Sequence, residues 1–210
     1  MNEETPSRLT VIHSRYLIPI RPARKILESH SVVIGSGRIV AVLPTTEARE
    51  RYRESVEINL PDHALMPGLV NMHTHSPMTL LRGYAEDLPM QQWLNERVWP
   101  AERRFVCEEF VADGIRLAMT EMSRAGTTCF NEAYFHPDIM AAAVTQAGMR
   151  ACIGLPVIEW SSTWAGNANE YLEKGLDVFH QWAGGSHLTF SLAPHAPYSV
   201  SDVSLDHIAS

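Results

Sequence analysis

The chain alternates between two hydrophobic patterns from about Leu65 to its end. Short apolar segments typical of buried strands are separated by longer segments with the spacing of helices. The expected strands are 66–75, 127–130, 150–157 and 188–193, and the expected helices are 88–98, 108–125, 139–147 and 169–182. Such alternation predicts parallel βαβ units, eight of which make a (β/α)8 barrel. We therefore expect an α/β chain that forms the N-terminal half of a barrel within a larger protein.

The residues before Leu65 follow a different pattern, which indicates small β structure. Segments 9–20, 31–34, 38–42 and 55–60 have strand-like composition, and Gly35-Ser36-Gly37 predicts a three-residue hairpin loop. These strands are too few to close a sandwich by themselves. We expect residues 1–64 to be a portion of a β-sandwich and residues 65–210 to hold the first four βα units of an incomplete barrel.

Composition narrows the possible functions. The net charge of -7, from 17 basic and 24 acidic residues, argues against a nucleic-acid-binding protein. The cysteines, Cys107, Cys129 and Cys152, are far apart, which favours reduced thiols over disulfides or a zinc ribbon. No apolar run is long enough to cross a bilayer, and no signal peptide is evident. We expect a soluble cytoplasmic protein that binds neither nucleic acid nor membranes.

Two histidines end the first strand of the alternating region. The strand follows a turn at Pro67-Gly68, and Pro77 stops it shortly after His73 and His75. Side chains alternate along a strand, so both imidazoles should leave on one face, where they could bind one metal ion. A solvated histidine pair is the simpler alternative. The position at the carboxyl end of a barrel strand favours the metal site, because active sites of such barrels lie there.

The stretch from Pro67 to His75 resembles the opening strand of the amidohydrolase superfamily. The continuation is similar to the 5-methylthioadenosine/S-adenosylhomocysteine deaminase group, which overlaps in sequence with triazine and guanine-type aminohydrolases. The segments that carry this narrower resemblance are 78–88, Trp93-Leu94, Trp99-Pro100-Ala101-Glu102, 126–131 and 193–198.

This resemblance implies a TIM-like, metal-dependent hydrolase barrel preceded by part of a small β-sandwich. It also implies one divalent metal, zinc being preferred, whose bound water attacks the ring carbon that carries the amino group. His73 and His75 match the first two ligands. The family's other ligands, a fifth-strand histidine and an eighth-strand aspartate, and its proton-carrying glutamate are expected beyond Ser210. No catalytic residue is therefore expected within this chain.

Two further residues match substrate contacts of the family. Glu102 corresponds to a carboxylate that accepts hydrogen bonds from ribose hydroxyls, and a solvated glutamate is the alternative. His195 corresponds to a histidine at the end of the fourth barrel strand that contacts substrate, and a structural loop histidine is the alternative. Some members use an arginine on the third strand, where this chain has Leu155. Trp160 and Trp164 could wall a purine or its thioether, or pack locally.

The few lysines of the chain indicate how many metal ions the site would hold. Binuclear relatives bridge two metals with a modified lysine at the end of the fourth strand, whereas this chain has only Lys25 and Lys174. One metal is therefore expected. The zinc-deaminase signature H-x-E with P-C-x-x-C is absent from the sequence, which excludes the cytidine-deaminase design.

The expected function is deamination of the adenine ring of 5-methylthioadenosine or S-adenosylhomocysteine, a purine nucleoside substrate, by an enzyme that forms homo-oligomers. One alternative is a related hydrolase that deaminates or dechlorinates guanine or a triazine ring. The other is a truncated, non-catalytic fragment, because the third ligand is not in the chain.

Overall fold

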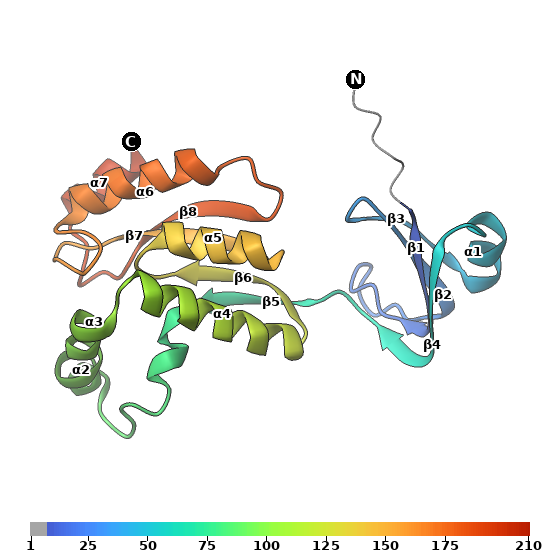
Figure 1. Ribbon diagram of the computed structural model, residues 1–210, viewed down its shortest axis with the longest axis horizontal. Coiled ribbons are helices and arrows are strands. Elements are labelled where there is room, and N and C mark those ends of the chain that lie inside the picture. The colour runs from blue at the N-terminus through green and yellow to red at the C-terminus, as the bar shows by residue number, and fades with distance from the viewer. Residues whose placement is uncertain (1–7) are drawn as a thin grey trace. The chain divides into compact units, whose positions relative to one another are not determined.

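The computed structural model describes residues 8–210, which form two compact units divided between Pro67 and Gly68 (Figure 1). Each unit has its own sheet and its own core. No helix of the described residues is long and apolar enough to cross a membrane.

The N-terminal unit is a four-stranded sheet with one helix packed on it. The strand order is β3-β2-β1-β4, in which β1 is antiparallel to β2 and parallel to β4. Val11, Val33, Leu43 and Ala48 form its core. Its elements are β1 (Thr10–Leu17), β2 (Leu27–Gly35), β3 (Arg38–Pro44), α1 (Thr45–Arg51) and β4 (Val56–Leu65).

Two details of this unit differ from the sequence-based expectations. Gly35 pairs with Arg38, so the hairpin loop is the two-residue turn Ser36-Gly37, not a three-residue loop. Both turn residues have positive φ, 49° and 71°, which matches the right-handed twist of the flanking strands. Helix α1 was not predicted.

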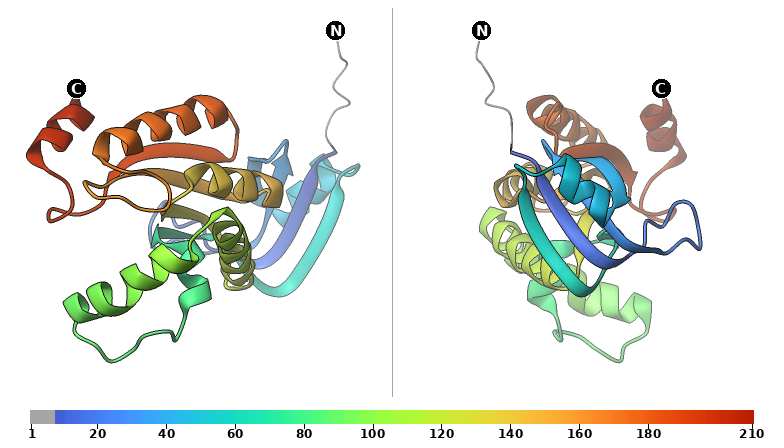
Figure 2. Two further views of the ribbon diagram at one scale, coloured as in Figure 1. Left: turned by 60° about the vertical axis from the view of Figure 1, so that its left-hand side comes forward. Right: turned by 90° about the vertical axis from the view of Figure 1, so that its right-hand side faces the viewer.

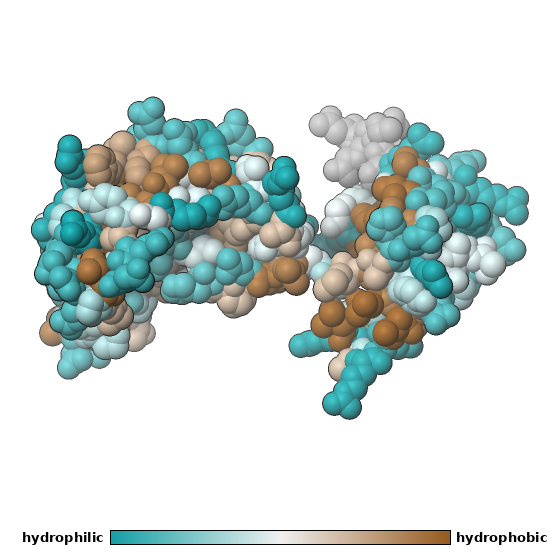
Figure 3. All heavy atoms as spheres, turned by 90° about the horizontal axis from the view of Figure 1, so that it is seen from below, coloured by the Kyte–Doolittle hydropathy of each residue, from teal (hydrophilic) through white to brown (hydrophobic). Residues whose placement is uncertain are grey.

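Large apolar side chains also reach the surface of this unit (Figure 3), among them Ile39 and Ile58, which are 67% and 41% exposed.

The second unit is a parallel sheet in the order β5-β6-β7-β8, and helices connect its successive strands. Figures 1 and 2 show α4, α5 and α6 lying along one face of this sheet. This is the order of neighbouring strands in a (β/α)8 barrel, and it confirms the predicted α/β class. The elements are β5 (Leu69–Thr74), η1 (Ser76–Leu81), α2 (Met90–Trp93), η2 (Leu94–Val98), α3 (Trp99–Phe105), α4 (Glu108–Arg124), β6 (Thr127–Ala133), α5 (Pro137–Ala147), β7 (Arg150–Val157), α6 (Ala168–Trp182), β8 (Leu188–Pro194) and α7 (Asp202–Ala209).

The core of this unit lies between the sheet and its helices. Ile115 of α4, Met140 of α5 and Ile153 of β7 are fully buried in one cluster. Along β6, the buried residues Phe130 and Glu132 share one face because strand side chains alternate. The other face of the sheet is therefore free to form the wall of a cavity.

The helical segment after η1 differs from the prediction that Pro100 ends it. The chain continues from α2 through the π-helical turn η2 into α3, and Pro100 lies in the first turn of α3. A proline in a helix interior removes one backbone hydrogen bond and crowds the carbonyl group four residues earlier. The wider π turn directly before Pro100 accommodates both effects.

Candidate active site

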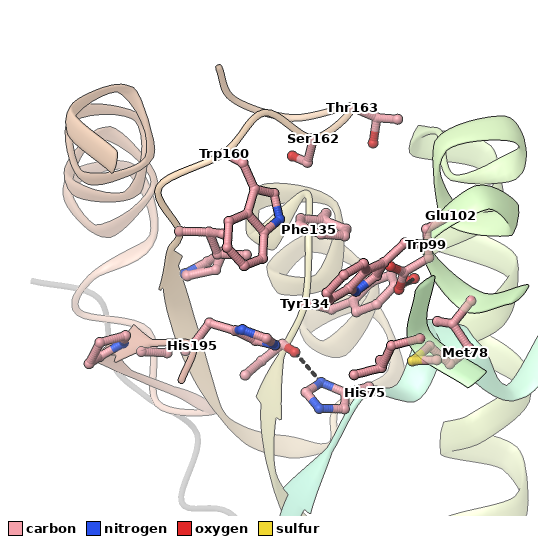
Figure 4. A pocket seen from close by; sticks show the side chains of 18 of the residues that line it. His75, Met78, Trp99, Glu102, Tyr134, Phe135, Trp160, Ser162, Thr163 and His195 are labelled. Carbon is pink, nitrogen blue, oxygen red and sulfur yellow. Dashed lines mark hydrogen bonds between the residues drawn. The ribbon is translucent and has the colours of Figure 1, made fainter. Parts of the chain in front are cut away.

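A cavity of about 600 Å³ opens at the carboxyl ends of the four parallel strands. Its walls come from the end of β5, from the α2–α3 segment, from the end of β6 and from the loops after β7 and β8. His73, His75, Glu102 and His195 all line it, so the structure brings together every site residue predicted from the sequence. Figure 4 shows His75, Glu102 and His195 around the cavity.

The two histidines lie side by side, although not by simple strand alternation. Thr74 pairs with Glu132 whereas Asn71 pairs with Phe130, so β5 has one extra residue in this interval. Such a bulge changes the direction of the side chains around it. His75 lies just after the last residue of β5, and its ring centroid is 4.9 Å from that of His73.

His75 has the tautomer and charge that a metal ligand needs. Its Nδ1 donates a hydrogen bond of 2.5 Å to the carbonyl oxygen of Ala133 (dashed in Figure 4), which leaves the Nε2 lone pair available. Burial lowers the pKa of His75, and the nearby His73 adds to this effect. The neutral imidazole is therefore favoured at pH 7. Among residues 8–210, no group of three or more His, Cys, Asp or Glu side chains could hold a metal ion.

Glu102 is half-buried in the cavity wall and is held by a tyrosine. The hydroxyl group of Tyr134 donates a hydrogen bond of 2.8 Å to Oε1 of Glu102. Burial raises the pKa of Glu102, and the hydrogen bond from Tyr134 partly opposes this rise. Burial and the neighbouring Glu102 raise the pKa of Tyr134, which therefore remains a donor. The second carboxyl oxygen of Glu102, Oε2, takes no part in the hydrogen bond from Tyr134.

His195 follows β8 directly and lies on the opposite wall from Glu102 (Figure 4). Its backbone N–H donates to the carbonyl oxygen of Val157, and its Nδ1 is 2.8 Å from the hydroxyl oxygen of Ser199. These contacts tie the loop after β8 to the end of β7. The imidazole is thereby held at the cavity beside Tyr198, whose ring centroid is 6.0 Å away.

Sequence reasoning missed Tyr134, and the structure decides between the two alternatives that the sequence left open for Trp160 and Trp164. Tyr134, which lies just past the end of β6, carried one signal, namely its position at the carboxyl end of a parallel strand. Trp160 lines the cavity and packs edge-on against Trp99, with ring centroids 5.7 Å apart. Trp164, in contrast, is buried in the core against Tyr171.

Leu155 does not occupy a cavity position. It is 3% exposed and packs toward α6, where it faces Gly175. Its neighbours Gly154 and Pro156 are the β7 residues that line the cavity. The alternation of β7 turns Leu155, which stands where some family members have an arginine, toward the helices and away from the cavity.

Comparisons with known proteins agree with this geometry. A profile described as the amidohydrolase family matches residues 64–210. The chain is 41% identical to a 5-methylthioadenosine/S-adenosylhomocysteine deaminase of Saccharophagus degradans, over 100% of this chain and 47% of that protein. A zinc-bound adenosine deaminase from Xanthomonas campestris superposes with a TM-score of 0.93 at 46% identity, over 95% of this chain and 46% of that one.

A more distant structure shares the fold. An atrazine chlorohydrolase from Arthrobacter aurescens, complexed with zinc, has a TM-score of 0.83 at 17% identity, over 95% of this chain and 49% of that one. The chain spans about half the length of the curated relatives and solved structures that it matches.

Proposed function

The chain belongs to the amidohydrolase family, and from this premise we propose that its cavity is part of the active site of a metal-dependent aminohydrolase. The proposed reaction removes ammonia from the adenine ring of 5-methylthioadenosine or S-adenosylhomocysteine and leaves the inosyl product. The observation that carries the proposal is that one cavity is lined by the His73–His75 pair and by the carboxyl group of Glu102.

His73 and His75 are proposed to hold one divalent metal ion, preferably zinc. The hydrogen bond from His75 to Ala133 supports this role, because it orients the ring and leaves Nε2 as an acceptor. When bound, such an ion activates water at neutral pH. The zinc bound in the similar adenosine deaminase from Xanthomonas campestris supports the choice of metal. The remaining ligands and the proton carrier are proposed to lie outside residues 1–210, so none of these residues is assigned a proton-transfer role.

Glu102 and His195 are proposed to position the substrate. Glu102 can accept a ribose hydroxyl at Oε2 while Tyr134 occupies Oε1. His195 would contact the base from the opposite wall (Figure 4). The cavity volume of about 600 Å³ lies within the range of small-molecule sites. Residues 1–64 are proposed to be part of a small β-sandwich and residues 65–210 the first four βα units.

A substrate panel with a metal measurement tests this proposal. Ammonia release is measured with 5-methylthioadenosine, S-adenosylhomocysteine, adenine, guanine and a chlorinated triazine, for the complete protein that carries the remaining ligands and for its His75→Ala variant; residues 1–210 alone are expected to be inactive. We expect turnover of the two nucleosides, about one equivalent of zinc in the unsubstituted protein, and loss of both in His75→Ala. His180→Ala, which removes an exposed imidazole of α6 far along the chain, is the matched control and should retain both.

Two results would contradict the proposal. Turnover of guanine or the triazine without turnover of the nucleosides would favour the related ring hydrolase. Absence of turnover for every compound, with zinc bound, would favour a non-catalytic role.

A further inference from the structure

The backbone ladder between β5 and β6 is irregular where the two histidines lie. It runs regularly from Val70 to Asn71 and resumes only at Thr74, which pairs with Glu132. The backbone N–H of His73 donates instead to the side chain of Asn71, at 3.3 Å. Something other than regular strand pairing must therefore hold the turn that carries His75.

Side chains and one carbonyl of β6 provide that support. The amide of Asn131 donates to the carbonyl oxygen of Met72 at 3.2 Å, and the carbonyl of Ala133 accepts from His75. Between them, Oε2 of Glu132 accepts two hydrogen bonds. One comes from the backbone N–H of Ser76 at 2.9 Å. The other comes from the hydroxyl of Thr74 at 3.0 Å, whose single proton is shared with the carbonyl oxygen of Asn131 at 2.8 Å.

Glu132 thus binds the residue before His75 and the residue after it. Its carboxyl group is 0% exposed and lies on the helix-facing side of β6, so it cannot reach a ligand in the cavity. A buried carboxyl group costs free energy unless its hydrogen bonds compensate, which makes this residue an unusual choice for packing alone. Burial raises the pKa of Glu132 to about 8, although the bonds from Ser76 and Thr74 oppose the rise.

The opposite side of the turn is closed by a helix. A Cβ atom at Gly114 of α4 would lie 2.5 Å from the carbonyl oxygen of Pro77, so α4 and η1 are in direct backbone contact. The turn after His75 is consequently enclosed between α4 and the carboxyl group of Glu132. Loss of that carboxyl group would remove the hydrogen bonds that it accepts from Thr74 and Ser76, and would leave only the contacts with Asn131 and Ala133 on the β6 side.

We propose that Glu132 is a positioning residue that fixes the orientation of His75, and thereby the geometry of the metal site, through its hydrogen bonds to Thr74 and Ser76. This inference rests on the proposed function, because it assumes that His73 and His75 bind a metal. It assigns Glu132 no contact with metal or substrate.

The test measures zinc affinity by competition with a chelator, together with thermal unfolding of the metal-free protein. Glu132→Leu keeps an apolar side chain of similar size but removes the acceptor, and we expect zinc binding to weaken roughly 10- to 100-fold, as for other residues that orient metal ligands. Glu132→Gln retains an oxygen acceptor and should restore affinity to within a few-fold. Thr74→Val removes the hydroxyl that Glu132 and the carbonyl of Asn131 share, and should weaken binding by roughly threefold to tenfold.

Phe130→Leu is the matched control. Phe130 is 1% exposed, two residues earlier on the same face of β6, and is part of the hydrophobic core. This substitution should lower thermal stability without changing zinc affinity. If Glu132→Leu does not fold, Thr74→Val and Glu132→Gln still decide the matter.

Unchanged zinc affinity in both Glu132→Leu and Thr74→Val would overturn the inference. An equal loss of affinity in Phe130→Leu would also overturn it, since the effect would then be one of general stability. Failure of the unsubstituted protein to bind zinc would instead overturn the proposed function, and this inference with it.

Discussion

The hydroxyl group of Tyr134 donates a 2.8 Å hydrogen bond to Oε1 of Glu102, and this bond joins the end of β6 to helix α3 across the cavity wall. Tyr134 is 5% exposed, so water competes little for this contact. The bond orients the carboxyl group and uses one of its oxygens. This hydrogen bond leaves Oε2 of Glu102 to the proposed substrate contact.

Tyr134→Phe should move the acidic limb of the kcat/KM profile for 5-methylthioadenosine to higher pH. Activity falls as Glu102 gains a proton, and burial already raises its pKa. The hydrogen bond from Tyr134 favours the ionised form, so its loss raises the pKa further. Tyr198→Phe removes a hydroxyl group elsewhere at the cavity and is the control. An acidic limb that stays in place in Tyr134→Phe would show that this bond does not tune Glu102.

Glu102→Gln should weaken binding of 5-methylthioadenosine by about 1.5–3 kcal/mol, the range for hydrogen bonds to charged groups. Binding of free adenine, which has no ribose hydroxyls, should change much less. Calorimetric titration of both ligands measures the difference. Equal losses for the two ligands would identify Glu102 as a structural residue.

Gly114→Ala should destabilise the protein by about 1–3 kcal/mol, because the new methyl group would meet the backbone of Pro77 and force η1 to move. Gly175→Ala is a matched control in helix α6, where the new Cβ would lie 3.2 Å from Cβ of Leu155, a less severe approach than at Gly114. Helix α6 would have to shift only slightly, and alanine gains about 1 kcal/mol in helix propensity, so we expect a smaller loss of stability. Urea denaturation of both variants checks the order, and an equally stable Gly114→Ala protein would refute the close contact.

Glu132→Gln should change how stability depends on pH. The pKa of Glu132 is raised to about 8 in the folded protein, so the folded state keeps its proton while the unfolded chain loses it above its ordinary value. Between these two values, stability should fall as pH rises, by about 1.4 kcal/mol per pH unit. Glu132→Gln has no proton to lose there. Urea denaturation of metal-free protein at pH 5.5 and 7.5 should therefore show the unsubstituted protein losing stability relative to Glu132→Gln as pH rises, and parallel curves would contradict the raised pKa of the buried carboxyl group.

Much of the fold follows from local patterns. The observed boundaries of β7 are the predicted ones, and those of α4 and α6 differ from the predicted boundaries by one residue at most. Ser201 caps α7, as predicted, by accepting a hydrogen bond from the backbone N–H of Ser204. Hydrophobic periodicity and capping are properties of neighbouring residues, so the sequence carries them directly. The His-x-His motif is local in the same sense, and its pairing was predicted from its spacing alone.

The contacts that shape the site are not local, and only the tertiary structure decided them. Tyr134 reaches Glu102 across 32 positions, and Glu132 reaches Ser76 across 56. The bulge in β5 depends on how β6 pairs with it, and the inward or outward direction of Leu155 depends on the register of β7. No periodicity encodes such pairings, because they arise when separate strands and helices pack at one end of a sheet. The sequence by itself therefore determined the parallel α/β unit and the histidine pair, whereas packing determined which buried groups hold that pair in place.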